Sequence, residues 1–177
     1  MKTTFLQKGK FIFKISLLLA ILLTMINCKK DKNTDPAPPP AASQTTQDPL
    51  EGFFVQSGLI EKKVSLINNG FNESGFSFIP KTNGNIIALV LTLPAANEEL
   101  RVTIWNKKTG KVLITEMVNF PKADVEVVKV IAPLVLVEGT EYLISMNTDD
   151  WYSFTRNDGK AISYPFSVGD ITVTSYL

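Results

Sequence analysis

The stretch from Glu99 to Asn147 limits the possible folds more than any other part of the chain, because short apolar strands and turns follow one another through it. Leu100, Val102 and Ile104 alternate with polar residues, the period of two that puts one face of a β-strand in a core. Gly110 ends the next turn, where a short hairpin needs a residue that adopts positive φ at little cost. No helical spacing of apolar residues interrupts the pattern. The stretch therefore predicts antiparallel strands joined by hairpins.

Similar patterns flank this stretch on both sides. Turn signals such as 68–70 and 157–159 recur at intervals of about 8–12 residues, as in sandwiches. The apolar run 85–93 predicts a central strand covered on both faces, and 53–55 predicts a short first strand or a packed lead-in. We expect an all-β, antiparallel β-sandwich of about eight or nine strands in two sheets, with immunoglobulin-like or jelly-roll topology.

The run from Val125 to Ile131 changes the phase of its apolar residues. Glu126 and Lys129 are three residues apart, so a regular strand would place them on opposite faces. A β-bulge near Val127 would shift the register by one residue and turn both charges to water.

The first residues have the pattern of a secretory signal. Basic residues come first, at Lys2, Lys8, Lys10 and Lys14, and the apolar stretch Ile15–Ile26 follows. Its length fits the roughly 7–15 apolar residues of a signal peptide better than the about 20 of a membrane-spanning helix. The alternative is an anchor helix extended back through Phe11, with the charge of Lys14 inside it at a cost. We assign residues 1–27 to the signal peptide.

Cys28 is the only cysteine, and it directly follows the apolar stretch. Residues 25–28, Met-Ile-Asn-Cys, resemble a bacterial lipobox, with methionine where leucine is usual and asparagine where a small residue is usual. The resemblance implies an acylated, palmitate-bearing Cys28 as the first mature residue, held in membrane lipid. Charged residues 29–32 resemble the export signals of outer-membrane lipoproteins, so the expected location is the outer membrane, surface-exposed or facing the periplasm. The alternative is an incidental thiol.

The residues after Cys28 are too polar and too rich in proline to fold alone. Residues 31–48 contain four prolines and no large apolar side chain, a composition typical of a disordered or polyproline spacer. A proline-rich docking motif is the alternative. We assign residues 28–49 to the lipidated cysteine and its tether, and residues 50–177 to the β-sandwich.

The composition excludes several classes of function. The chain has no histidine, which rules out a Ser-His-Asp triad, a Cys-His pair and any His-ligated metal site. One cysteine permits no intrachain disulfide. A net charge of +1 without a basic stripe offers no nucleic-acid signature. We expect no enzymatic activity, no cofactor and no bound metal.

The segment Asn147–Phe154 contains the strongest candidate binding residues. Trp151 and Tyr152 lie beside Asp149 and Asp150. Aromatic rings stack on the faces of sugar rings and carboxylates accept their hydroxyl hydrogen bonds, so the group predicts a saccharide platform. Trp105, on the polar side of its strand, is a further candidate. In the alternative, these rings pack in the core and the two aspartates form an ordinary turn.

Two other sets of acidic and amide residues could supply oxygen ligands or catalytic acids. A calcium site would draw on Asn147, Asp149, Asp150, Asp158 and Asp170. Their spacing matches no known loop, and solvated turn residues are the preferred interpretation. A glycosidase would need two facing carboxyl groups from among Glu116, Glu126, Glu138 and Glu141. None of these lies in a recognisable motif.

Two segments of the sandwich carry a family resemblance. Residues 105–113 read W-x-x-x-T-G-x-x-L, and residues 136–142 read L-x-x-G-x-x-Y. From about Gly75 onward the chain resembles a bacterial β-sandwich family of unknown function, found in secreted and surface proteins and sometimes beside carbohydrate-active modules. The resemblance implies a sandwich fold and an extracellular setting, and it carries over no catalytic residue.

Together these features predict a membrane-anchored, non-catalytic surface binding or adhesion module associated with carbohydrate. Its expected partners are membrane lipid through acylated Cys28 and a glycan or an envelope protein, with no nucleic acid. The alternative function is a structural or protein-interaction subunit of an envelope complex. A glycoside hydrolase is the third hypothesis.

Overall fold

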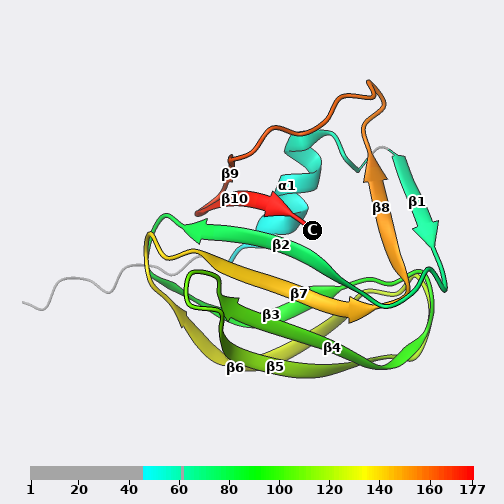
Figure 1. Cartoon of the computed structure of the whole chain (residues 1–177), viewed down its shortest axis with the longest axis horizontal. Coiled ribbons are helices and arrows are strands. Elements are labelled where there is room, and N and C mark those ends of the chain that lie inside the picture. Colours follow the sequence, from blue (N-terminus) through cyan, green and yellow to red (C-terminus); the bar gives the residue numbers. More distant parts are fainter. Residues whose placement is uncertain (1–45, 61) are drawn as a thin grey trace, which may run out of the picture. The chain divides into compact units, whose positions relative to one another are not determined.

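The structure, a computed structural model, describes residues 46–60 and 62–177, which belong to one compact unit, Gln44–Leu177. The predicted signal peptide, Cys28 and most of the predicted tether lie outside the described residues. One helix and ten strands are present in this part of the chain (Figure 1). They are α1 (Pro49–Ser57), β1 (Lys62–Leu66), β2 (Asn72–Pro80), β3 (Gly84–Leu91), β4 (Asn97–Asn106), β5 (Lys111–Phe120), β6 (Val127–Leu136), β7 (Tyr142–Thr148), β8 (Trp151–Thr155), β9 (Phe166–Val168) and β10 (Ile171–Tyr176).

A six-stranded antiparallel sheet forms one layer, in the order β5-β4-β7-β2-β10-β9. The alternation predicted for β4 is present, since Leu100, Val102 and Ile104 are buried on the inner face. Gly110 has a φ of 67° at the β4–β5 turn, which confirms the hairpin and the reason for its glycine.

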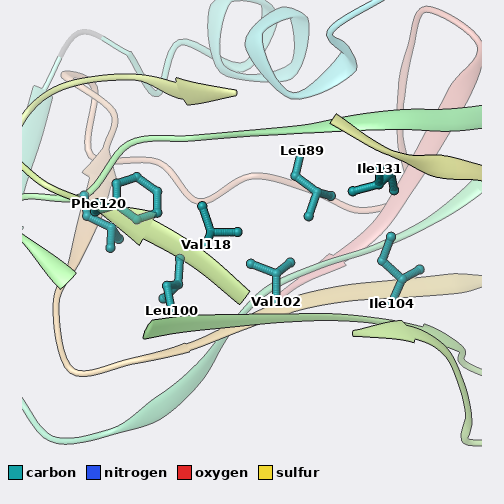
Figure 2. Packing of buried hydrophobic residues seen from close by; sticks show 8 residues of the cluster. Leu89, Leu100, Val102, Ile104, Val118, Phe120 and Ile131 are labelled. Carbon is teal, nitrogen blue, oxygen red and sulfur yellow. The ribbon is translucent and has the colours of Figure 1, made fainter. Parts of the chain in front are cut away.

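The two-stranded antiparallel sheet β3–β6 packs against the inner face of this sheet. Figure 2 shows Leu89 and Ile131, from β3 and β6, facing side chains of β4 and β5 across the core. At the edge of the sandwich, Lys129 Nζ lies 3.7 Å from Glu116 Oε2 and links β6 to β5. The prediction of an all-β, antiparallel sandwich is confirmed. The predicted eight or nine strands in two sheets are wrong in number, because the described part of the chain has ten strands in three sheets.

Helix α1 covers the other half of the inner face, above β2, β9 and β10. Phe53 is fully buried and packs in a second core with Phe78, Val168 and Val173. The Asp48 carboxylate caps the helix by accepting hydrogen bonds from two backbone N–H groups at 3.1 Å. The prediction of a short first strand at 53–55 is therefore wrong. No helix among the described residues is long and apolar enough to span a membrane.

The third sheet is a ribbon in which β1 pairs with β8, far apart in the sequence. It stands beside the sandwich, with α1 and the segment after β8 next to it (Figure 1). Four of the five residues of β1 are exposed, so this strand contributes little to either core.

Two details of the β3–β6 sheet differ from the prediction. Residues 85–93 are not covered on both faces, because Ile87 and Val90 are 47% and 41% exposed. The bulge of β6 lies at residues 131–133, opposite Ile87, and not near Val127. Lys129 consequently faces Glu116 across the edge of the sandwich instead of pointing into open water.

Candidate functional site

An aromatic cleft of about 670 Å³ lies where α1, β8, the segment 156–164 and the end of β10 meet. Figure 1 shows these four elements around one region of the molecule, although they come from both ends of the described chain. Six aromatic side chains line the cleft: Phe54, Trp151, Tyr152, Phe154, Tyr164 and Tyr176. Apolar clefts of this size, with a few polar groups, are the usual form of small-ligand sites.

One wall of the cleft is a stack between the helix and the ribbon. The rings of Phe54 on α1 and Phe154 on β8 lie 4.3 Å apart at an interplanar angle of 25°. This stacked geometry is favourable beyond the area it buries. The stack therefore fixes the position of β8 against α1 and sets the width of the cleft.

Tyr152 contributes to the lining but is almost entirely buried, with 8% of its surface exposed. Its hydroxyl donates a hydrogen bond to the carboxylate of Asp124, in the β5–β6 loop. The Nζ atom of Lys63 lies 3.3 Å from the centre of its ring and covers one face. Tyr152 thus fastens the ribbon to the sandwich, and its ring offers no open face for stacking.

Tyr164 and Tyr176 present the most accessible rings of the cleft, with 37% and 39% of their surfaces exposed. Tyr164 is supported from behind by Phe53, whose ring centre lies 6.3 Å away. Burial raises the pKa of the Tyr164 phenol; burial, together with repulsion from Tyr164, raises the pKa of the Tyr176 phenol. Both phenols therefore remain protonated at neutral pH and can donate and accept hydrogen bonds.

Two cations, Arg156 and Lys160, also line the cleft, whereas none of the lining residues is an aspartate or glutamate. Arg156 holds Asp158 through two hydrogen bonds of 2.8 and 2.7 Å and donates to the carbonyl of Ser57. The hydrogen bonds from Arg156 lower the pKa of Asp158 to about 2. Arg156 thus ties the segment after β8 to the end of α1, and the exposed ammonium of Lys160 gives the mouth of the cleft a positive charge.

The structure separates the residues predicted as one platform. Trp151 lines the cleft and is half-buried. The Asp150 carboxylate is buried and accepts a hydrogen bond of 2.8 Å from the backbone N–H of Asn68. The backbone carbonyl of Asp149 accepts one of 2.9 Å from the next residue, Asn69. Both aspartates therefore hold the β1–β2 turn to the β7–β8 turn and do not line the cleft.

Trp105 also lies outside the cleft. It is half-buried on β4, where it pairs with Leu143 of β7 and Val112 of β5. Ile104, the residue before it, is buried on the inner face. Adjacent residues of a strand point to opposite faces, so Trp105 lies on the outer face of the six-stranded sheet, as the alternation predicted.

The other acidic residues do not assemble into a reaction centre with the cleft. In the described residues, no group of three or more histidine, cysteine, aspartate or glutamate side chains could hold a metal ion. Glu141 forms an ion pair of 2.9 Å with Lys107. Neither it nor Glu116, Glu126 or Glu138 lines the cleft.

Sequence reasoning did not identify Tyr164 and Tyr176 as candidates. Each stands in a separate segment, and only the fold brings them to Trp151. No family model matches the chain, and searches of curated proteins and of solved structures find no match either. The resemblance to the sandwich family therefore stays a prediction.

Proposed function

We propose that the protein is a membrane-anchored, non-catalytic surface module that binds a saccharide in the aromatic cleft. The observation that carries this proposal is the pair of partly exposed tyrosines, Tyr164 and Tyr176, lining a cleft that Trp151 also lines. Sugar rings offer apolar C–H faces to such rings and hydroxyl groups to such phenols. A volume of about 670 Å³ is of the size that small ligands occupy.

The charge of the lining narrows the class of saccharide. Lys160 adds a positive charge at the mouth, and the lining contributes no carboxylate side chain against it. Opposite charges raise both the encounter rate and the selectivity for a ligand. We therefore expect acidic saccharides, such as uronate-containing chains, to bind more tightly than neutral ones.

The anchor belongs to the same proposal. A multiply acylated Cys28 would hold the module at the outer membrane, since several acyl chains anchor stably where one binds only marginally. The proline-rich tether would let the cleft reach ligands away from the lipid surface.

The two tryptophans of the chain provide a matched test. Isothermal titration calorimetry against a panel of acidic and neutral polysaccharides should identify a ligand. Trp151→Ala should then weaken binding by about tenfold or more, equivalent to about 1.4 kcal/mol. Trp105→Ala makes the same change outside the cleft and should leave affinity unchanged. A panel without any ligand, or equal losses in both variants, would contradict the proposal.

A second candidate function, a protein-interaction subunit of an envelope complex, is favoured by the exposed apolar side chains of β1 and the turn after it, Val64, Ile67 and Phe71. Crosslinking in intact membranes distinguishes the two functions. A different protein recovered in a fixed stoichiometric ratio, together with silence in the polysaccharide panel, would favour the subunit.

A further inference from the structure

The sheet β3–β6 turns an aliphatic face to solvent. This outer aliphatic face consists of Ile87, Val90, Val128, Val130, Val135 and Val137, which are between 41% and 76% exposed. The opposite face of the same sheet carries Leu89, Ile131 and Leu136 into the two cores. The described part of the chain leaves the outer aliphatic face uncovered.

The residues of this face are not scattered singly, although Val135 pairs with Asn85 and Val137 directly follows β6. Val90 pairs directly with Val128 across the two strands, and Val130 pairs with Ala88. Opposite residues of an antiparallel pair lie side by side on one face. All six members are β-branched, so their side chains lose little rotamer freedom when they are covered.

The sequence of both strands is that of a sheet buried on two sides. Residues 85–93 are apolar apart from Asn85 and Thr92, and residues 127–137 apart from Lys129. Antiparallel strands with one solvated face normally alternate apolar and polar residues, whereas continuous apolar runs are typical of strands covered on both faces. The pattern therefore indicates that something covers this face.

The chemistry of the face selects among possible occupants. A membrane surface is usually met by tryptophan, tyrosine and basic residues, and none of the six members is aromatic or charged. Transient interfaces with other proteins are about as polar as ordinary surface, whereas homodimer interfaces are more apolar. Two copies of an uncharged, flat sheet face also meet without electrostatic repulsion and can pack as the layers of a sandwich do.

We propose that the outer aliphatic face is the contact surface of a homodimer, in which the β3–β6 sheets of two copies pack face to face about a two-fold axis. Such a contact is isologous, because the same patch serves both copies. Six aliphatic side chains from each copy, with their rims, would bury on the order of 1,000 Å² in total, which is the size that a specific interface needs.

The mass of the particle tests this proposal. Native mass spectrometry of the full chain, purified in a mild detergent and diluted through the micromolar range, should show a species of twice the mass of one chain. Val130→Lys places a charge at the most exposed position of the face, where the dimer contact would bury it in both copies. This variant should therefore be monomeric at every concentration.

Val112→Lys is the matched control, because Val112 is a 44% exposed strand valine on β5, outside the face. It should remain dimeric, and far-UV circular dichroism should show that both variants fold. A wild-type chain that is monomeric at every concentration would overturn the proposal. The face would then be covered by lipid or by another protein. A dimer that persists in Val130→Lys would also overturn it, by placing the contact elsewhere. Should Val130→Lys fail to fold, Val128→Lys, also on the face and 56% exposed, takes its place.

Discussion

Phe53 shows how much of the packing between α1 and the sheet depends on one side chain. It is fully buried, and its ring centre lies 5.3 Å from that of Phe166 and 6.3 Å from that of Tyr164. The same ring therefore supports both the second core and an accessible wall of the cleft.

We predict that Phe53→Ala lowers the free energy of unfolding by about 3–5 kcal/mol, because it removes a large buried ring and leaves a cavity. Urea denaturation followed by circular dichroism measures this change. Val55→Ala lies on the same helix, where Val55 is 59% exposed, and should change stability by less than about 0.5 kcal/mol. Similar effects of the two substitutions would contradict the described position of the helix.

Glu141, directly before β7, joins the β4–β5 turn to β10 and makes part of the stability dependent on pH. It accepts hydrogen bonds from Thr174 at 2.6 Å and from Lys107 at 2.9 Å. These two bonds lower the pKa of Glu141 from its ordinary value of 4.5. A lowered pKa in the folded chain means that the ionised carboxylate adds stability above the ordinary pKa. That stability disappears as the pH falls through the lowered value.

The free energy of unfolding should therefore fall more steeply between about pH 5 and pH 3 in the wild type than in Glu141→Gln. Urea titrations at several pH values measure the two slopes. Glu138→Gln, at an exposed position in the same turn, is the control and should keep the wild-type slope. Equal slopes for the wild type and Glu141→Gln would show that the contacts of Glu141 with Lys107 and Thr174 do not make the stability depend on pH.

At the scale of elements, the amino-terminal helix has the complete set of end signals. Asp48 caps its first turn, Pro49 opens it, and Gly58 ends it with a φ of 74°. These signals were present in the sequence, but three neighbouring apolar residues, 53–55, were interpreted as a short first strand or a packed lead-in. A helix of nine residues is too short for apolar periodicity to identify it, so its caps are the better evidence.

Asp48→Ala should destabilise the protein by about 1 kcal/mol, because two backbone N–H groups lose their acceptor. Asp48→Asn keeps a side-chain oxygen at the cap and should retain most of the stability. Thermal unfolding of the three proteins decides between these outcomes, and equal losses in both variants would point to the charge of Asp48 and not to its hydrogen bonds.

The ribbon β1–β8 is the least supported sheet of the structure. Two strands alone are marginally stable, and β1 is mostly exposed. We predict that the backbone amides of β1 and β8 exchange hydrogen faster than those of β4 and β7, in the middle of the six-stranded sheet. Hydrogen–deuterium exchange with mass spectrometry measures both groups in one experiment. Tyr152→Phe, which removes the bond to Asp124, should increase the difference.

At the scale of the whole molecule, periodicity and turn chemistry were sufficient to predict the class of fold. The alternation of Leu100, Val102 and Ile104 predicted the inner face of β4, and Gly110 predicted the hairpin that follows. The arrangement of strands in three sheets could not be predicted, because β1 and β8 pair although most of the strands of the sandwich lie between them in the sequence. Pairings of this range leave no local pattern.

The cleft was only partly predictable for the same reason. Trp151 and Tyr152 were identified from an aromatic cluster in one segment and both line the cleft, but Lys63 covers one face of the Tyr152 ring and its hydroxyl donates to Asp124. Asp150 was predicted to bind a ligand, but its buried carboxylate instead accepts a hydrogen bond from the backbone of the β1–β2 turn. Tyr164 and Tyr176 reach the cleft through tertiary structure alone.

The pairing of β1 with β8 also has a consequence for the order of events during synthesis. Strand β1 precedes the other strands, but its partner β8 is made only after the six strands β2–β7. A nascent chain that ends before Trp151 already contains every residue of the core between β3–β6 and β4–β5. It still lacks β8, which forms one wall of the cleft. Closing so long a loop is entropically costly until the intervening strands have docked. The wall of the cleft that β8 provides would therefore form only after the strands between β1 and β8 have folded.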